Sequence, residues 1–166
     1  MLERLTPARL LAAACALLVP LFAVGWLTRQ DPAETPWLRI LGGGFIFNYR
    51  VAEVYYGFTA AVARPLPTGS IVEAAFEDPG GGPPLLVRQR VGGAEMTRLS
   101  LRSPPVRGVA ADRDYHVRLR VLDRDGAHLL WSDELAFRSG ISDSVVPDVP
   151  LTVGPGYARN PAAAGD

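Results

Sequence analysis

The strongest constraint on the fold is an alternation of apolar and polar residues at the period of a β-strand. It is clearest from Tyr115 to Val121, where every second residue is apolar and the intervening positions hold one histidine and two arginines. Because successive side chains of a strand point to opposite faces, this segment predicts a strand with one buried face and one wet face. Asp125-Gly126 then predicts a hairpin turn, which makes Leu129 to Phe137 the partner strand.

The same alternation recurs in short segments along the chain, separated by turns rich in glycine and proline. Seven short strands with an apolar set on one face of each describe two packed antiparallel sheets, so the predicted fold class is all-β. The seven expected strands cover residues 45–49, 51–63, 71–77, 87–91, 98–102, 115–121 and 129–137.

Two of these segments carry local ambiguities. Val51 to Ala63 fits the apolar face of a helix as well as that of a strand, and Gly57, Thr59 and two adjacent tyrosines favour the strand. In the last strand, Ser132-Asp133-Glu134 interrupts the alternation in the way that a β-bulge would.

One stretch resembles a known architecture. The pattern Val109-x-Ala111-x-Arg113-x-Tyr115-x-Val117-x-Leu119 is similar to that of fibronectin type III and related immunoglobulin-like domains, with Tyr115 at the place of their tyrosine corner. The resemblance implies an antiparallel immunoglobulin/fibronectin-III-like sandwich. It implies the fold alone, because this sandwich hosts many unrelated functions.

The N-terminal part contains 18 residues without a charge, from Leu10 to Leu27. At 1.5 Å per residue a helix of this length reaches about 27 Å, close to the hydrocarbon core of about 30 Å, so the segment predicts a single transmembrane helix. Arg4 and Arg9 precede it, which predicts a cytoplasmic N-terminus, an inner-membrane location and a periplasmic domain. The expected anchor residues are Leu10, Leu11, Leu17, Leu18, Leu21, Phe22, Trp26 and Leu27.

A cleaved signal peptide is the alternative for this segment. Leu10 to Phe22 would then be the apolar region, and Ala23-Val24-Gly25 would supply the small residues of the cleavage site. The mature domain would in that case be exported without an anchor.

The remaining organisation follows from proline and glycine. We expect a head and anchor over residues 1–27, an extended linker over 28–42, the sandwich over 43–140 and a Pro/Gly-rich tail over 141–166. Within the tail, Leu151 to Tyr157 is more apolar than a plain tail requires. Two interpretations remain open, that it covers an edge strand of its own sandwich or that it docks on a partner.

The composition excludes several classes of function. Seventeen basic and seventeen acidic residues cancel, which argues against nucleic acid as a partner. The single cysteine, Cys15, lies in the apolar segment, and neither His116 nor His128 has the neighbours of a catalytic or metal site. Glu73 and Glu77 are about 13 Å apart along a strand, too far to act as an acid/base pair. We therefore expect no catalytic residue, no metal and no cofactor.

The basic residues of the chain are all arginines, and several fall on the wet faces of expected strands. They could form a patch for an acidic partner, or they could be neutralised by cross-strand pairs with Glu73, Glu77, Asp133 and Glu134, each exposed pair contributing about 0.2–1 kcal/mol. The candidate partner contacts are Arg88, Arg90, Arg118, Arg120 and Tyr157.

These observations predict a non-enzymatic interaction module, an accessory or scaffolding subunit of a bacterial membrane complex that binds another envelope protein. The bacterial origin is inferred from the use of arginine to the exclusion of lysine, with abundant alanine, glycine and proline. The alternative is a small-ligand or lipid-binding sandwich that uses an aromatic cluster, although packing of these aromatics in the core competes with it. The cluster comprises Phe45, Phe47, Tyr49, Tyr55, Tyr56 and Phe58.

Overall fold

The computed structural model describes residues 7–28, 35–93 and 95–163. The chain forms two units, residues 1–35 and residues 36–166, which are treated separately below. The side chains of Arg9 and Leu10, the positive charge at Arg4 and residues 29–34 of the expected linker lie outside the described residues.

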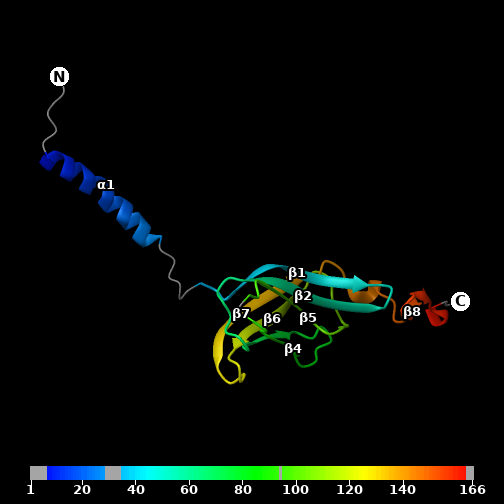
Figure 1. The fold of residues 1–166 in the computed structure, drawn as a ribbon. Helices are drawn as coiled ribbons and strands as arrows, with labels where there is room; N and C mark the ends of the chain where they lie inside the picture. The colour runs from blue at the N-terminus through cyan, green and yellow to red at the C-terminus, as the bar shows by residue number, and fades with distance from the viewer. Residues whose placement is uncertain (1–6, 29–34, 94, 164–166) are drawn as a thin grey trace. The chain divides into compact units, whose positions relative to one another are not determined.

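The first unit contains one helix, α1, over Pro7–Leu27 (Figure 1). Proline suits the first position of a helix because the missing N–H would have no partner there, and the Thr28 hydroxyl donates to the Val24 carbonyl at the other end. In the described part of the chain, no helix combines the length and the apolar character needed to cross a membrane. The predicted transmembrane helix over Leu10–Leu27 is thus not supported.

The second unit consists of antiparallel sheets, as the alternation predicts (Figure 1). A three-stranded sheet has the order β1-β2-β5, and a four-stranded sheet has the order β4-β3-β6-β7. A small third sheet pairs β8 with β9. The strands are β1 (Leu38–Asn48), β2 (Glu53–Val62), β3 (Ile71–Phe76), β4 (Leu85–Arg90), β5 (Arg98–Arg102), β6 (Asp114–Leu122), β7 (Leu129–Arg138), β8 (Thr152–Val153) and β9 (Ala158–Arg159), and short 3-10 turns cover Asp143–Val145 and Pro161–Ala163.

Aromatic side chains from the two larger sheets meet in a common core. The ring of Tyr56 in β2 lies edge-on to Phe76 in β3, with centroids 5.2 Å apart, and Phe58 in β2 stacks on Phe137 in β7. Both tyrosine and phenylalanine bury large apolar areas, so such contacts dominate the energy of a core. The two sheets therefore pack face to face as a sandwich.

The ambiguous segment 51–63 is a strand. In β2 the residues Val54, Tyr56, Phe58 and Ala60 are buried and the residues between them are half-buried, which is the period of two. Most of the aromatic cluster accordingly packs in the core, and Tyr55 points to the outer face.

Strand β1 starts earlier than the sequence suggests. It begins at Leu38, inside the expected linker, and Gly42-Gly43-Gly44 lies within the strand and not before it. A register shift between Ile40 and Gly42 bends the strand at this point. Three consecutive glycines are typical of a loop, but here pairing with β2 holds their backbone in an extended conformation.

The expected bulge of β7 is displaced. Ser132-Asp133-Glu134 pairs with β6 without interruption, and the register shift lies between Val121 and Leu122, opposite Leu129–Trp131. Asp133 lies opposite Leu119, on the face of the sheet that points toward the core. Its side chain is nevertheless exposed because β7 is an edge strand. An inward charge at an edge is a common way of blocking edge-to-edge pairing.

Tyr115 makes the hydrogen bond of a tyrosine corner. Its ring is fully buried, and its hydroxyl accepts a hydrogen bond of 2.7 Å from the backbone N–H of Ala110. The guanidinium of Arg113 lies over the same ring, 4.8 Å from its centroid. This bond ties the loop before β6 to the strand.

The tail is fastened to the turn between β1 and β2. Arg107 donates 2.9 Å hydrogen bonds to the carbonyls of Ala52 and Pro147, and the backbone N–H of Thr152 donates to the carbonyl of Arg50. Val146 is buried against the core. The tail therefore packs on its own domain at this turn, and not along an edge strand.

Replacing Tyr115 by phenylalanine should lower the free energy of unfolding by about 1 kcal/mol, because the N–H of Ala110 loses its acceptor. Chemical denaturation of the full chain measures this difference. Tyr157→Phe is the control, since its ring is largely exposed and should leave stability unchanged. Equal midpoints for the two variants would contradict the role assigned to Tyr115.

Candidate interaction surfaces

Glu73 lies at the centre of the outer face of the four-stranded sheet. Its carboxylate accepts a 2.6 Å hydrogen bond from Nε of Arg88 in β4, and bonds from Nε (2.8 Å) and Nη2 of Arg120 in β6. The three residues are in register across the sheet. The predicted cross-strand pairing of Glu73 is confirmed, but its solvated position is not, because the two guanidiniums cover it and leave its side chain about 1% exposed.

Burial and hydrogen bonding act on Glu73 in opposite directions. Burial raises the pKa of the carboxyl, but the hydrogen bonds from Arg120 and Arg88 and their charges outweigh it, so the pKa lies below its ordinary value. The carboxylate is therefore charged at neutral pH. It offsets one of the two positive charges that it binds.

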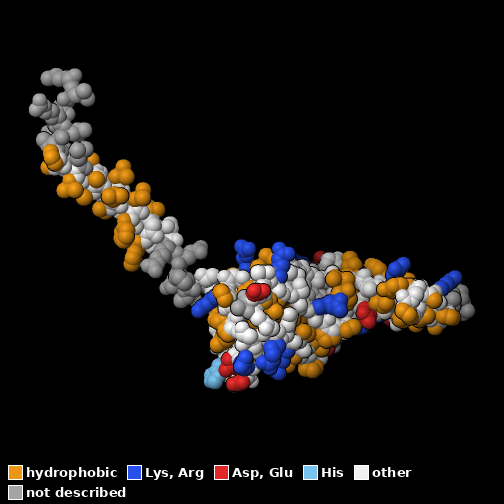
Figure 2. All heavy atoms as spheres, in the orientation of Figure 1, with side chains coloured by type: hydrophobic (Ala, Val, Ile, Leu, Met, Phe, Trp, Pro, Cys, Tyr) orange, Lys and Arg blue, Asp and Glu red, His pale blue; other side chains and the backbone are white. Residues whose placement is uncertain are grey.

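The other two predicted arginines of this face differ from each other. Nη1 of Arg90 donates to the carbonyls of Gly69 (2.8 Å) and Arg124 (3.0 Å), which joins two loops at one end of the sheet. Arg118 stands opposite Glu134 in the register, while the Glu134 carboxylate contacts His116 at 3.3 Å. Figure 2 shows that arginine side chains are spread over the visible face of the domain, with acidic side chains beside some of them. On this face Glu73 pairs with Arg88 and Arg120, while Arg90 is hydrogen-bonded to neutral carbonyls.

Tyr157 is not part of the arginine face. It lies in the hairpin between β8 and β9, and Arg50 of the β1–β2 turn is positioned over its ring at 5.4 Å. The structure thus separates the five predicted contacts into two places.

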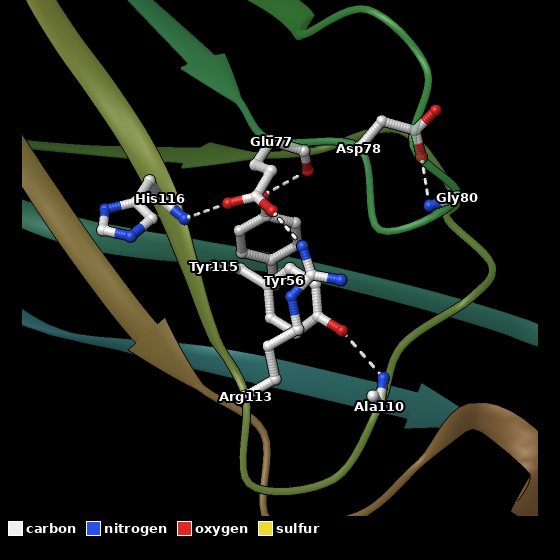
Figure 3. A network of polar contacts seen from close by, with 8 residues as sticks. All are labelled: Tyr56, Glu77, Asp78, Gly80, Ala110, Arg113, Tyr115 and His116. Carbon is white, nitrogen blue, oxygen red and sulfur yellow. Dashed lines mark hydrogen bonds and ion pairs between the residues drawn. The ribbon is translucent and has the colours of Figure 1, made fainter.

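A polar network joins β2, β3 and β6 (Figure 3). The Tyr56 hydroxyl donates to the Glu77 carbonyl at 2.6 Å, and the Glu77 carboxylate accepts from Arg113 (2.7 Å) and from the backbone N–H of His116 (3.0 Å). Burial, followed by the nearby carboxylates, raises the pKa of Tyr56 well above its ordinary value, so the hydroxyl stays protonated and donates. These bonds hold strands together and leave no nucleophile next to a base.

The outer face of the three-stranded sheet carries a hollow of about 490 Å³, here called the trench. Its floor is formed by Gly44 of β1 and Gly57 of β2, which lie opposite each other. Arg102 of β5 lies opposite Gly57 on the other side and completes this cross-strand row. One wall is the row of Ile46 and Tyr55. The other side is formed by Gly42, Thr59 and Ser100, and the two hydroxyls of this row lie 2.9 Å apart.

The absence of a side chain has two different causes among the glycines of the trench. At Gly57 a Cβ would come within 2.9 Å of the Cα of Arg102, and at Gly43, on the inner face, it would overlap the ring of Phe137. These two glycines are required by close packing. At Gly42 a Cβ would meet no atom within 4 Å, so packing inside the domain does not explain the missing side chain there.

The charge of the trench comes from Arg102. Its guanidinium lies 4.2 Å from the centroid of the Tyr55 ring, in a cation–π contact that orients it. No acidic side chain lines the trench. It therefore combines an apolar floor and wall, two hydroxyls and one positive charge.

Sequence reasoning missed the trench because it placed Gly42-Gly43-Gly44 before the first strand, which it expected at 45–49. The available signal is the spacing of glycines two apart in one strand, facing a glycine in the middle of the next strand. Recognising it requires the register of β1 against β2, which the sequence pattern does not give.

Within the described ranges, no group of three histidine, cysteine, aspartate or glutamate side chains is arranged to hold a metal ion.

Comparisons with known proteins add little. No protein-family model matches the chain, and no curated protein matches it. Among solved structures it is similar to wild-type OgpA from Akkermansia muciniphila, with 11% identity and a TM-score of 0.37 over 69% of this chain and 31% of that one. The chain thus spans less than a third of the length of OgpA.

Glu73→Gln should lower the free energy of unfolding at pH 7 by about 1–3 kcal/mol, because two guanidiniums lose a charged acceptor. The folded pKa of Glu73 lies below its unfolded value, so this stabilisation is present above about pH 4.3 and disappears as pH falls through the folded pKa. Denaturant titrations at several pH values measure the difference between the two proteins.

The control is Glu134→Gln, whose carboxylate is exposed and contacts His116 at 3.3 Å. It should change stability by less than about 0.5 kcal/mol. A wild-type advantage over Glu73→Gln that persists undiminished at acid pH would contradict the assigned linkage.

Proposed function

We propose that the second unit is a non-enzymatic interaction module, an accessory subunit of a bacterial envelope complex, and that it binds a partner protein through the trench. The observation that carries this proposal is the open space above Gly42 and Gly44, bordered on the far side by the exposed Ile46, which no part of the described domain fills. Interface cores combine apolar surface with aromatic and arginine side chains, and Tyr55 and Arg102 supply these here.

The proposed module has an immunoglobulin/fibronectin-III-like fold. The hydrogen bond between Ala110 and Tyr115 supports this, as does the partition of seven antiparallel strands into sheets of three and four.

We further propose that α1 associates the chain with a membrane, with the β-domain on the extracytoplasmic side. Large apolar side chains of α1 are exposed on consecutive residues, for instance Leu17, Leu18 and Val19, and thus on several sides of the helix. Figure 2 shows hydrophobic side chains along its length. A helix that is apolar on all sides is stable when an apolar environment covers it.

A small-ligand site is the alternative function for the trench. Its volume of about 490 Å³ lies within the range of ligand pockets, about 300–1,000 Å³. However, such pockets enclose most of the ligand surface, whereas the trench lies on the outer face of a sheet and suits a partner that itself covers the exposed side.

Gly42→Leu should abolish capture of the partner, because the new side chain projects into the trench. The measurement is affinity purification of tagged full-length chain from its own cells after cross-linking, with the stoichiometry of the partner determined by mass spectrometry. Gly140→Leu is the matched control, since a Cβ there also meets nothing within 4 Å but lies outside the trench.

Both variants should keep the wild-type stability within about 0.5 kcal/mol, as expected for surface changes. A stoichiometric partner that is retained by Gly42→Leu would refute the trench as the binding surface. A partner lost equally from both variants would point to another surface.

Removal of Pro7–Leu27 should release the chain from sedimented membranes into the supernatant, because the exposed apolar residues of α1 are then missing. Immunoblotting of both fractions measures this. The wild-type chain recovered in the supernatant would contradict membrane association.

A further inference from the structure

We propose that the trench recognises a carboxylate side chain of the partner that lies within two or three residues of an apolar side chain, with Arg102 binding the carboxylate. This inference rests on the proposed function and names the chemistry of the partner.

Arg102 has its hydrogen-bonding capacity free. It is exposed on the outer face of β5, and the structure shows no ion pair or hydrogen bond of its guanidinium with any of the described residues. Stacking on Tyr55 uses a face of the planar group and leaves the N–H donors in its plane available. A guanidinium held in this way binds a carboxylate with two parallel hydrogen bonds.

The arrangement favours a carboxylate over other acceptors. The trench lining contains one positive charge and no negative charge, so it attracts a single anionic group. The contact with Tyr55 already restricts the arginine side chain, which lowers the entropy lost on binding. The outer face of the other sheet differs, because there Glu73 already occupies two of the arginines.

The floor of the trench provides the contact surface for the apolar side chain that lies near the carboxylate of the partner. The backbone of Gly44 and Gly57 is part of the β1–β2 ladder, and no side chain stands above it, so the floor offers a flat apolar surface beside Ile46. Two strand spacings, about 10 Å, separate the positions of Gly44 and Arg102 in the row. The Arg102 guanidinium contacts the Tyr55 ring of β2, and separations of up to about 10 Å match side chains one to three residues apart in an extended peptide.

The test uses a phage-displayed library of random heptapeptides, selected on the immobilised full-length chain with Gly42→Leu as the counter-selection. The expected result is enrichment of aspartate or glutamate within three positions of a large apolar residue. For the best peptide, an Asp→Asn or Glu→Gln change should weaken binding by about tenfold, the loss expected for a charge-assisted pair.

Arg102→Gln should remove this tenfold difference between the acidic and the amide peptide. Arg98→Gln is the matched control, because Arg98 is exposed on the same face of the same strand and does not line the trench. It should leave the difference unchanged.

The outcomes separate the two proposals. Peptides that bind the wild type but not Gly42→Leu, and that show no acidic enrichment or no dependence on Arg102, would overturn the carboxylate inference while leaving the trench as the binding surface. Failure to select any peptide, or peptides that bind Gly42→Leu equally, would overturn both.

Discussion

The packing of Tyr56 between the two sheets is the contact on which the domain depends. Its ring stacks on Phe45 at 4.6 Å, meets Phe76 edge-on and lies 6.2 Å from Tyr115, so one side chain contacts both layers of the sandwich. The hydroxyl extends past the apolar core to the carbonyl of Glu77, which satisfies the polar end of the ring. Because the core is formed by the inward-facing side chains around Tyr56, the outward-facing side chains of the two sheets can differ without changing the core.

They differ in how charge is treated. On the four-stranded sheet, Glu73 binds two arginines and Arg90 joins two loops. Three of the four arginines predicted for this face are thus hydrogen-bonded to groups of the domain itself. On the three-stranded sheet, missing side chains produce a hollow, and the adjacent arginine is oriented by an aromatic ring. The first face contributes to stability, and the second is available for recognition.

Sequence reasoning succeeded where a single strand contains the information. The burial of alternate residues in β6, the strand at 51–63 and the pairing of Glu73 all follow from side-chain period and charge. It failed where the outcome depends on two strands at once. The start of β1 at Leu38, the shift of the bulge from Ser132–Glu134 to Leu130 and the trench are properties of register, which a row of glycines or an exposed edge aspartate does not reveal.

The attachment of the tail to the β1–β2 turn has a mechanical consequence. The chain enters the sandwich at Leu38, at one end of β1, while the hydrogen bond from Thr152 to the Arg50 carbonyl holds the C-terminal hairpin at the other end. A pull on the hairpin must therefore break this bond before the hairpin separates from the β1–β2 turn.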